Sequence, residues 1–483
     1  MGGPPNKGSL DRVVQRKGYK HTSTKLHPKI NPWSLLCVLI ILAGCSTAAR
    51  PVQTAADTVT INMGSTLGAP TYQASGFIYG LSPDASSPPQ NMLSDIKVKH
   101  LRVGGAQLGC PNGGWINSFS NYQTRWNTVK AYYTKAQAIG ATVIILLHDL
   151  WGADLVCTVN TFPGDNGDWT NYTNFMTQVI NDAKAAGMTG LNVQWDIWNE
   201  PDCCGFFGSR SESQYLEMWK RGFQQIRAAI SNAVITGPSF SQQPNGNAFP
   251  SYLDYIKANN VIPNVISWHE ERGGNDPTSD KSTLDTMLSS LGISISDGYN
   301  VNEYGTRSEQ DPGHSAWYLA RFTRNGMAGL RGNWGMNTGL WAGMGDLVTS
   351  NGQPLGQWWI YKRYADITGQ LVSVTPGSQV DAVAGTDTNA KKAIIVVGNE
   401  GGVTGLVNVV IHNIPSYLQN SRKIYVLVEQ MPTGNSYVSA PTVVSNSSMT
   451  LSENSLTVTI NWSTATDGYA ITLTPEKSSG STK

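Results

Sequence analysis

Strand-like apolar runs alternate with helical stretches between residues 76 and 368, and this alternation constrains the fold more than any other feature. Between the runs, apolar residues recur every three or four positions, which predicts helices with one face against a sheet. Eight strand-helix units over roughly 290 residues match a (β/α)8 barrel, which typically takes about 250 residues. A doubly wound open sheet alternates in the same way, but its Gly-x-Gly-x-x-Gly turn is absent after the first run. The eight runs are 76–80, 100–105, 141–148, 191–199, 233–238, 264–269, 298–303 and 329–334.

The pattern changes after residue 369, where short alternating strands are separated by Gly, Asn, Ser and Pro. This is typical of an all-β domain, most often a sandwich. The segment 58–63 has the same character and is expected to add a strand to it. We therefore predict an α/β protein with a (β/α)8 TIM barrel and a C-terminal β-sandwich joined by an N-terminal strand. The predicted boundaries are 1–49 for a targeting segment, 50–69 for the joining strand, 70–369 for the barrel, 370–476 for the sandwich and 477–483 for a disordered tail.

The first 49 residues have the pattern of a secretory signal. A basic stretch precedes the apolar run "LLCVLIILAG", and small residues follow it. About ten apolar residues are short for a membrane span of about 20, so a retained signal anchor is the minor alternative. The "LAGC" that ends at Cys45 also resembles a bacterial lipoprotein box. Glycosylation sequons at Asn171, Asn446 and Asn461 favour a secreted eukaryotic glycoprotein, and we expect an extracellular protein, lipid-anchored through Cys45 if it is bacterial.

Composition excludes some partners. Charged residues make up 14% of the chain and the net charge is +1, so no nucleic-acid partner is expected, nor a membrane partner after signal removal.

Four cysteines remain beyond the leader, and three pairings are open to them. Bonding the adjacent Cys203 and Cys204 would be strained, because neighbouring Cα atoms are about 3.8 Å apart and disulfides need about 4.4–6.8 Å. A bond between Cys110 and Cys157 is the first pairing to check. No metal site is expected, since the chain has no paired Cys-x-x-Cys motif.

Two glutamates stand at predicted strand ends. The stretch "VQWDIWNEP" ends the fourth run, and Pro201 predicts that Glu200 is held extended there. Glu303 ends the seventh run in "NVNEYG". In a barrel, reactive groups lie at the carboxyl ends of the strands. Two carboxylates at one mouth are what cleavage of a glycosidic bond requires, although ordinary surface or salt-bridged roles are the alternative.

"WNEP" at the end of a fourth strand, with a glutamate ending the seventh, is similar to the clan A glycoside hydrolases. A barrel followed by a sandwich with an N-terminal strand resembles glycoside hydrolase family 39 and its relatives, over about residues 58–476. The resemblance implies a retaining double displacement without a cofactor or metal, with Glu200 as acid and then base and Glu303 as nucleophile. The charge of Glu303 and partial burial are then predicted to raise the pKa of Glu200.

Seven further residues are candidate substrate-binding or supporting groups. Asn199 matches the clan residue that hydrogen-bonds the sugar 2-hydroxyl, and Arg102 is expected to keep Glu303 ionised. Structural roles are the alternative for each. The other five are His148, His269, Tyr304, Trp334 and Trp151.

These observations predict a secreted retaining glycoside hydrolase that acts on plant or microbial polysaccharides or their side chains. A xyloside- or arabinoside-type substrate is favoured, but the unusual loops 149–171 and 202–214 argue against a simple xylosidase. Exo or endo action stays open. The alternatives are a noncatalytic carbohydrate-binding surface protein on the same fold and a transglycosylase that uses the same intermediate.

Overall fold

A computed structural model describes residues 55–203, 205–271, 276–332, 340 and 343–476. The chain divides into two compact units, 1–52 and 53–483, and every described residue belongs to the second. The predicted targeting segment with Cys45, the predicted tail and Trp334 lie outside the described residues. None of the helices within the described ranges is long and apolar enough to cross a membrane.

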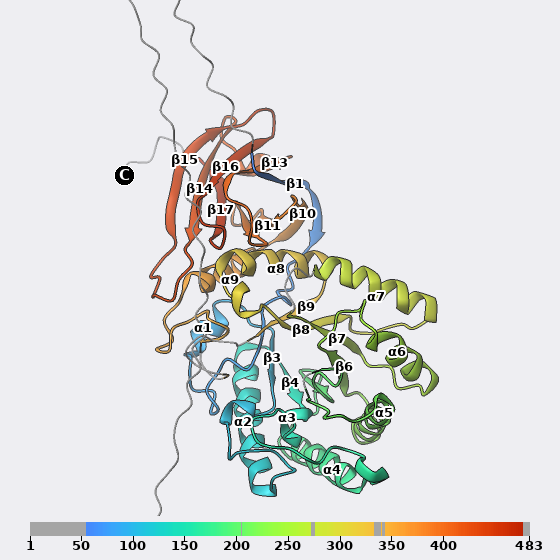
Figure 1. Cartoon of the computed structure of the whole chain (residues 1–483). Helices are drawn as coiled ribbons and strands as arrows, with labels where there is room; N and C mark the ends of the chain where they lie inside the picture. Colours follow the sequence, from blue (N-terminus) through green and yellow to red (C-terminus); the bar gives the residue numbers. More distant parts are fainter. Residues whose placement is uncertain (1–54, 204, 272–275, 333–339, 341–342, 477–483) are drawn as a thin grey trace, which may run out of the picture. The chain divides into compact units, whose positions relative to one another are not determined.

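Eight parallel strands form a closed barrel in the order β2 to β9 (Figure 1). Each of the eight predicted runs overlaps one of these strands, so the predicted barrel is confirmed. The register places the start of one strand beside the start of the next: His100 pairs with Gly76 on one side and with Thr142 on the other. The strands are β2 (Gly76–Ile78), β3 (His100–Val103), β4 (Thr142–Leu146), β5 (Val193–Asp196), β6 (Val234–Phe240), β7 (Val265–Glu270), β8 (Tyr299–Tyr304) and β9 (Ala328–Arg331).

Several helices begin and end at capping residues. Ser118, Ser211 and Asp311 accept backbone N–H groups at the first turns of α2, α5 and α8, and Gly140 and Gly326 end α2 and α8 in left-handed conformations. The helices are α1 (Gln90–Ser94), α2 (Phe119–Ile139), α3 (Leu147–Trp151), α4 (Thr170–Ala185), α5 (Glu212–Ala229), α6 (Ala248–Ala258), α7 (Pro277–Leu291), α8 (Pro312–Asn325) and α9 (Gly356–Ala365). Short 3-10 turns lie at Ala106–Leu108, Asp165–Gly167, Arg307–Glu309 and Ser416–Leu418.

The remaining strands form one continuous nine-stranded sheet in the order β15-β14-β17-β12-β11-β10-β1-β13-β16. The predicted N-terminal strand is part of it, because β1 pairs antiparallel with β10 and parallel with β13. The inward side chains share one apolar core. The strands are β1 (Asp57–Gly68), β10 (Gln370–Thr375), β11 (Val380–Asp387), β12 (Lys392–Asn399), β13 (Gly405–His412), β14 (Lys423–Met431), β15 (Thr442–Thr450), β16 (Leu456–Trp462) and β17 (Gly468–Pro475).

Helices α8 and α9 of the barrel pack against this sheet (Figure 1). Arg324 forms an ion pair with the fully buried Asp381 of β11, and Arg363 forms a bidentate pair with Glu429 of β14 at 2.7 Å for both bonds. Gly398 of β12 touches the backbone of Trp317, and a Cβ added at Gly398 would lie 2.1 Å from the Trp317 nitrogen. The sheet therefore covers one side of the barrel closely.

Candidate active site

Glu200 lies in a turn beyond its strand. Strand β5 ends at Asp196, and Glu200 has a φ of 41°. The prediction that Glu200 is extended is therefore wrong. Pro201 disfavours the right-handed helical region, and a hydrogen bond from the Glu200 N–H to the Ser239 carbonyl (2.9 Å) holds the backbone in the left-handed region instead. A positive φ at a non-glycine residue costs energy and is concentrated at functional sites.

Glu200, His269 and Glu303 lie together at the carboxyl ends of the strands. The His269 ring, at the end of β7, stands between the two carboxylates, with Nδ1 2.9 Å from Glu200 Oε1 and Nε2 3.7 Å from Glu303 Oε1. One carboxylate oxygen of Glu200 lies within 4.8 Å of one of Glu303. The His269 side chain is fully buried, Glu303 is 5% exposed and Glu200 13%, so Glu200 is the member that solvent reaches most easily.

Arg102 of β3 hydrogen-bonds Glu303 and two further residues at the carboxyl ends of the strands. Its guanidinium donates to Asp196 Oδ2 (2.8 Å), Glu303 Oε1 (2.6 Å) and Asn199 Oδ1 (2.6 Å). Asp196 is fully buried and also accepts a hydrogen bond from Ser239 at 2.9 Å. The predicted contact between Arg102 and Glu303 is confirmed, and the same cation fixes Asn199 next to Glu200.

The electrostatics of the free site differ from the prediction. Burial raises the pKa of Glu200, but the hydrogen bond and charge of His269 and the charge of Arg102 outweigh it, so the pKa of Glu200 is lowered. Burial lowers the pKa of His269, yet the two glutamates raise it to about 9. Burial raises the pKa of Glu303 against the charges of His269 and Arg102. The predicted increase in the Glu200 pKa is thus wrong here, because the proton rests on the imidazole that hydrogen-bonds Glu200.

A cavity of about 250 Å³ opens over the two glutamates. Asn199 and His148, two of the candidate substrate-binding residues, both line it. His148, on α3, contacts Asp149 through Nδ1 at 3.0 Å, and its buried Nε2 has no partner among the described residues. The lining residues are Tyr79, Ala106, His148, Asp149, Asp154, Asn199, Glu200, Phe206, Glu271, Glu303 and Leu340.

Four polar residues of this cavity, Tyr79, Asp149, Asp154 and Glu271, escaped the site prediction. Tyr79, just after β2, donates to Asp149 Oδ2 (2.8 Å), and Asp154 pairs with Arg125 (2.7 Å). Asp149 follows His148 directly in the sequence. The signal for Asp149 is a carboxylate directly after the apolar run 141–148, whereas Asp154 comes from an irregular loop whose position no pattern predicts.

Of the pairings that the sequence leaves open, the disulfide between Cys110 and Cys157 is present, and it fixes the loop that carries Asp154. It links residues that are 47 positions apart in the sequence. The loop after β3 is thereby joined to the loop after α3, which lies at the edge of the cavity.

Two predicted substrate contacts lie in the core instead. Tyr304 is fully buried, and its hydroxyl pairs with that of Tyr361. Trp151 is 1% exposed and donates to the Thr161 carbonyl at 3.2 Å. Both residues lie near strand ends, but their side chains point into the packing between the barrel and its helices. The predicted role of Trp334 concerns a residue outside the described part of the chain.

Within the described residues, Glu200, His269 and Glu303 form a group whose ligand atoms are close enough to hold a metal ion. Arg102 already places a positive charge 2.6 Å from Glu303 Oε1 and would repel a second cation. The geometry instead places a proton donor, the hydrogen-bonded pair of His269 and Glu200, and an anion, Glu303, beside one cavity. Arg102 holds that anion in place.

No family model matches the sequence, but solved structures share the fold. N2152 of Neocallimastix frontalis superimposes with a TM-score of 0.72 at 26% identity, over 87% of this chain and all of that protein. The family 39 glycoside hydrolase of Xanthomonas axonopodis pv. citri gives a TM-score of 0.57 at 11% identity, over 87% of this chain and 97% of that one. The fold is that of the clan A glycoside hydrolases.

A curated relative is a glycosidase. The 3-O-alpha-D-galactosyl-alpha-L-arabinofuranosidase of Bifidobacterium longum subsp. longum is 24% identical over 408 residues, which are 74% of this chain. The match covers 35% of that enzyme, so this chain spans about a third of its length. The clan A architecture that the sequence predicted is confirmed.

Proposed function

We propose that this protein is a retaining glycoside hydrolase with Glu200 as acid and base and Glu303 as nucleophile. The observation that carries the proposal is the close approach of the two carboxylates, whose nearest ligand oxygens lie within 4.8 Å. Retaining enzymes hold their carboxyl groups about 5–5.5 Å apart, whereas inverting enzymes need about 6.5–9.5 Å to admit a water.

The first step needs a proton on Glu200 and an anion at Glu303. When substrate fills the cavity, the proton of His269 crosses the 2.9 Å bond from Nδ1 to Glu200, which passes it to the leaving oxygen. Glu303 attacks the anomeric carbon at the same time and forms a glycosyl ester. Arg102, bonded to the same carboxylate, keeps Glu303 oriented and favours its ionised form.

The second step reverses the proton flow. The ester carries no charge, so Glu200, now an anion, takes a proton from water, and the resulting hydroxide attacks the anomeric carbon. Glu303 leaves as a carboxylate, and the proton on Glu200 returns to His269. The sugar is inverted twice, so it keeps its configuration.

The substrate we propose is an arabinose-bearing side chain of a plant or microbial polysaccharide, cleaved outside the cell. The arabinofuranosidase activity of the curated relative supports the sugar class. A cavity of about 250 Å³ with several polar side chains suits one terminal sugar residue. Extracellular action rests on the signal pattern of residues 1–49 and on the disulfide, since disulfides persist in oxidising compartments.

The test is a screen against aryl α-L-arabinofuranosides, β-D-xylosides and β-D-galactosides, beside arabinan and arabinogalactan. Wild type should release one sugar, and NMR of the first product should show the substrate's anomeric configuration. Glu303→Gln should lose activity by about three orders of magnitude or more, because no covalent ester forms. Glu200→Gln should keep slow turnover of aryl substrates with good leaving groups, and azide should accelerate it because an anionic nucleophile needs no base.

An inverted first product would contradict the retaining mechanism. Glycan binding without turnover would favour a noncatalytic binding protein, the alternative from another class. Release of longer oligosaccharides in place of free sugar would identify a transglycosylase. These three outcomes can be distinguished, because the product's configuration, the product's length and the binding isotherm are measured independently.

A further inference from the structure

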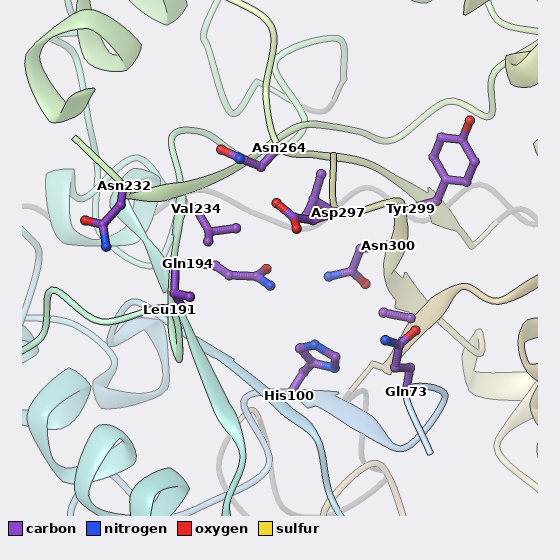
Figure 2. A pocket seen from close by; sticks show the side chains of 12 residues that line it. Gln73, His100, Leu191, Gln194, Asn232, Val234, Asn264, Asp297, Tyr299 and Asn300 are labelled. Atoms are coloured by element: carbon purple, nitrogen blue, oxygen red, sulfur yellow. The ribbon is translucent and has the colours of Figure 1, made fainter. Parts of the chain in front are cut away.

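A second cavity lies at the opposite end of the barrel from the two glutamates, where the strands begin (Figure 2). Its volume is about 310 Å³. His100, Val234 and Val265 are the first residues of β3, β6 and β7. This N-terminal cavity shares no lining residue with the catalytic one. Its lining residues are Gln73, His100, Leu191, Gln194, Asn232, Val234, Asn264, Val265, Asp297, Tyr299, Asn300 and Ala328.

Unpaired polar atoms lie at the floor of the N-terminal cavity. The side chain of Asn300 on β8 is 1% exposed, and neither its amide nitrogen nor its oxygen has a partner among the described residues. The buried Nδ1 of His100 is unpaired as well. Buried polar atoms are almost always hydrogen-bonded, because leaving them unpaired costs free energy. A molecule in the cavity would supply the missing partners.

The lining favours an uncharged ligand with several hydroxyl groups. Five carboxamides line the cavity. The oxygen of Asn264 already accepts from Arg227 and from the Ile235 N–H, and its nitrogen donates to Ser296. The other four can offer donors and acceptors, as a hydroxyl group does. Figure 2 shows Gln194, Asn300 and His100 converging on the central space, with the Asp297 carboxylate beside them. The described lining contains one carboxylate and no lysine or arginine, which disfavours anions such as phosphates or uronic acids.

Two further features refine the ligand class. His100 is hydrogen-bonded to the backbone of Gln73, and burial together with the charge of Lys99 lowers its pKa to about 4, so its ring is neutral and Nδ1 accepts. The Tyr299 hydroxyl points away from the cavity and donates to Asp285 at 2.6 Å. Recognition therefore depends on hydrogen bonds with amides, which donate and accept, and with an imidazole nitrogen, which accepts.

We propose that the N-terminal cavity is a second, noncatalytic binding site for one neutral sugar or polyol of monosaccharide size. Its volume of about 310 Å³ lies at the small end of the range of about 300–1,000 Å³ that is typical of ligand pockets, which suits a ligand of this size. Such hydrogen bonds replace bonds to water, so we expect a dissociation constant on the order of millimolar. The site lies apart from the catalytic cavity, and its occupancy would follow the concentration of free sugar.

The experiment combines crystals soaked in L-arabinose, D-galactose or glycerol with calorimetric titration of the same compounds. One compound should occupy the N-terminal cavity, with its hydroxyl groups bonded to Asn300 and His100. Asn300→Leu replaces both unpaired amide atoms with methyl groups of similar shape, and it should weaken binding at this site by about tenfold or more. Its kcat/KM for glycoside hydrolysis should stay within about twofold of wild type, because Asn300 touches neither glutamate.

A second variant and a control keep the result interpretable. Asn232→Trp, on the exposed rim, should block the cavity without changing its floor, so it tests the proposal even if Asn300→Leu folds poorly. Glu200→Gln alters only the catalytic cavity and should leave binding at the N-terminal cavity unchanged. Ordered water alone in the soaked crystals, or sugar binding that only Glu200→Gln abolishes, would overturn the proposal.

Discussion

At the residue scale, His269 determines where the catalytic proton rests. Its ring bonds Glu200, and the two glutamates raise its pKa to about 9. The alkaline limb of kcat/KM should therefore fall near pH 9, where the pair formed by His269 and Glu200 loses its proton. His269→Gln removes this cation, so Glu200 must hold the proton alone and the limb should move to lower pH, together with a loss of about tenfold or more in kcat.

The measurement is the pH dependence of kcat/KM for both proteins on one aryl glycoside. His412→Gln, at an exposed site on the sheet, is the matched control and should leave the profile unchanged. An alkaline limb that stays near pH 9 in His269→Gln would show that another group supplies the proton.

A second buried acid, Glu270, controls stability rather than chemistry. Its side chain, at the end of β7, accepts from Trp268 (2.8 Å) and is hydrogen-bonded to Asp280 of α7. Burial and the charge of Asp280 raise the pKa of Glu270 well above its ordinary value. The folded state thus holds a proton that the unfolded chain releases. The stabilising contribution is full below the unfolded pKa of about 4.3 and is lost as the pH rises through the folded pKa.

Glu270→Gln keeps the hydrogen bonds without needing that proton. Its free energy of unfolding should exceed that of wild type at alkaline pH, by about 1.4 kcal/mol for each pKa unit titrated. Chemical denaturation across a pH series measures this, with the exposed Glu453→Gln as control. Equal pH dependence in wild type and Glu270→Gln would mean that Glu270 is already ionised in the folded protein.

At the scale of the element, the disulfide between Cys110 and Cys157 fixes the loop that carries Asp154. A closed loop of 47 residues restricts the unfolded chain, a contribution of about 4 kcal/mol in the chain-entropy model. Cys157→Ser should therefore lower the melting temperature and raise KM more than it lowers kcat, because Asp154 lines the cavity without touching Glu200 or Glu303. Wild-type KM in the variant would show that Asp154 is held by Arg125 alone.

The strands and turns also show which parts of the fold and of the site can be predicted from sequence patterns. The eight barrel strands and both glutamates follow from apolar runs and from polar residues that end them. No apolar pattern predicts strand β15, because nearly all of its side chains are exposed and only its pairing with β14 makes it a strand. The turn at Glu200 and the place of Asp154 depend on long-range contacts to Ser239 and Arg125, which no local pattern contains.

At the scale of the whole molecule, the sheet supports the barrel. Helix α8 is buried along most of its length, and its arginines pair with Asp381 of the sheet. A barrel expressed without the sheet would expose this helix. We therefore expect the two parts to unfold together, in one calorimetric transition.

A substitution at Gly398 tests whether the barrel and the sheet unfold together. An added Cβ would lie 2.1 Å from the Trp317 nitrogen, a backbone atom that can move only if α8 moves with it. Gly398→Ala should destabilise the protein by about 1–3 kcal/mol, as overpacking does, and reduce activity as the barrel shifts. At Gly402 the added methyl meets the end of the Gln379 side chain, which can move away, so Gly402→Ala is the matched control. Two separate transitions in Gly398→Ala, with wild-type activity, would mean that the barrel functions without its support.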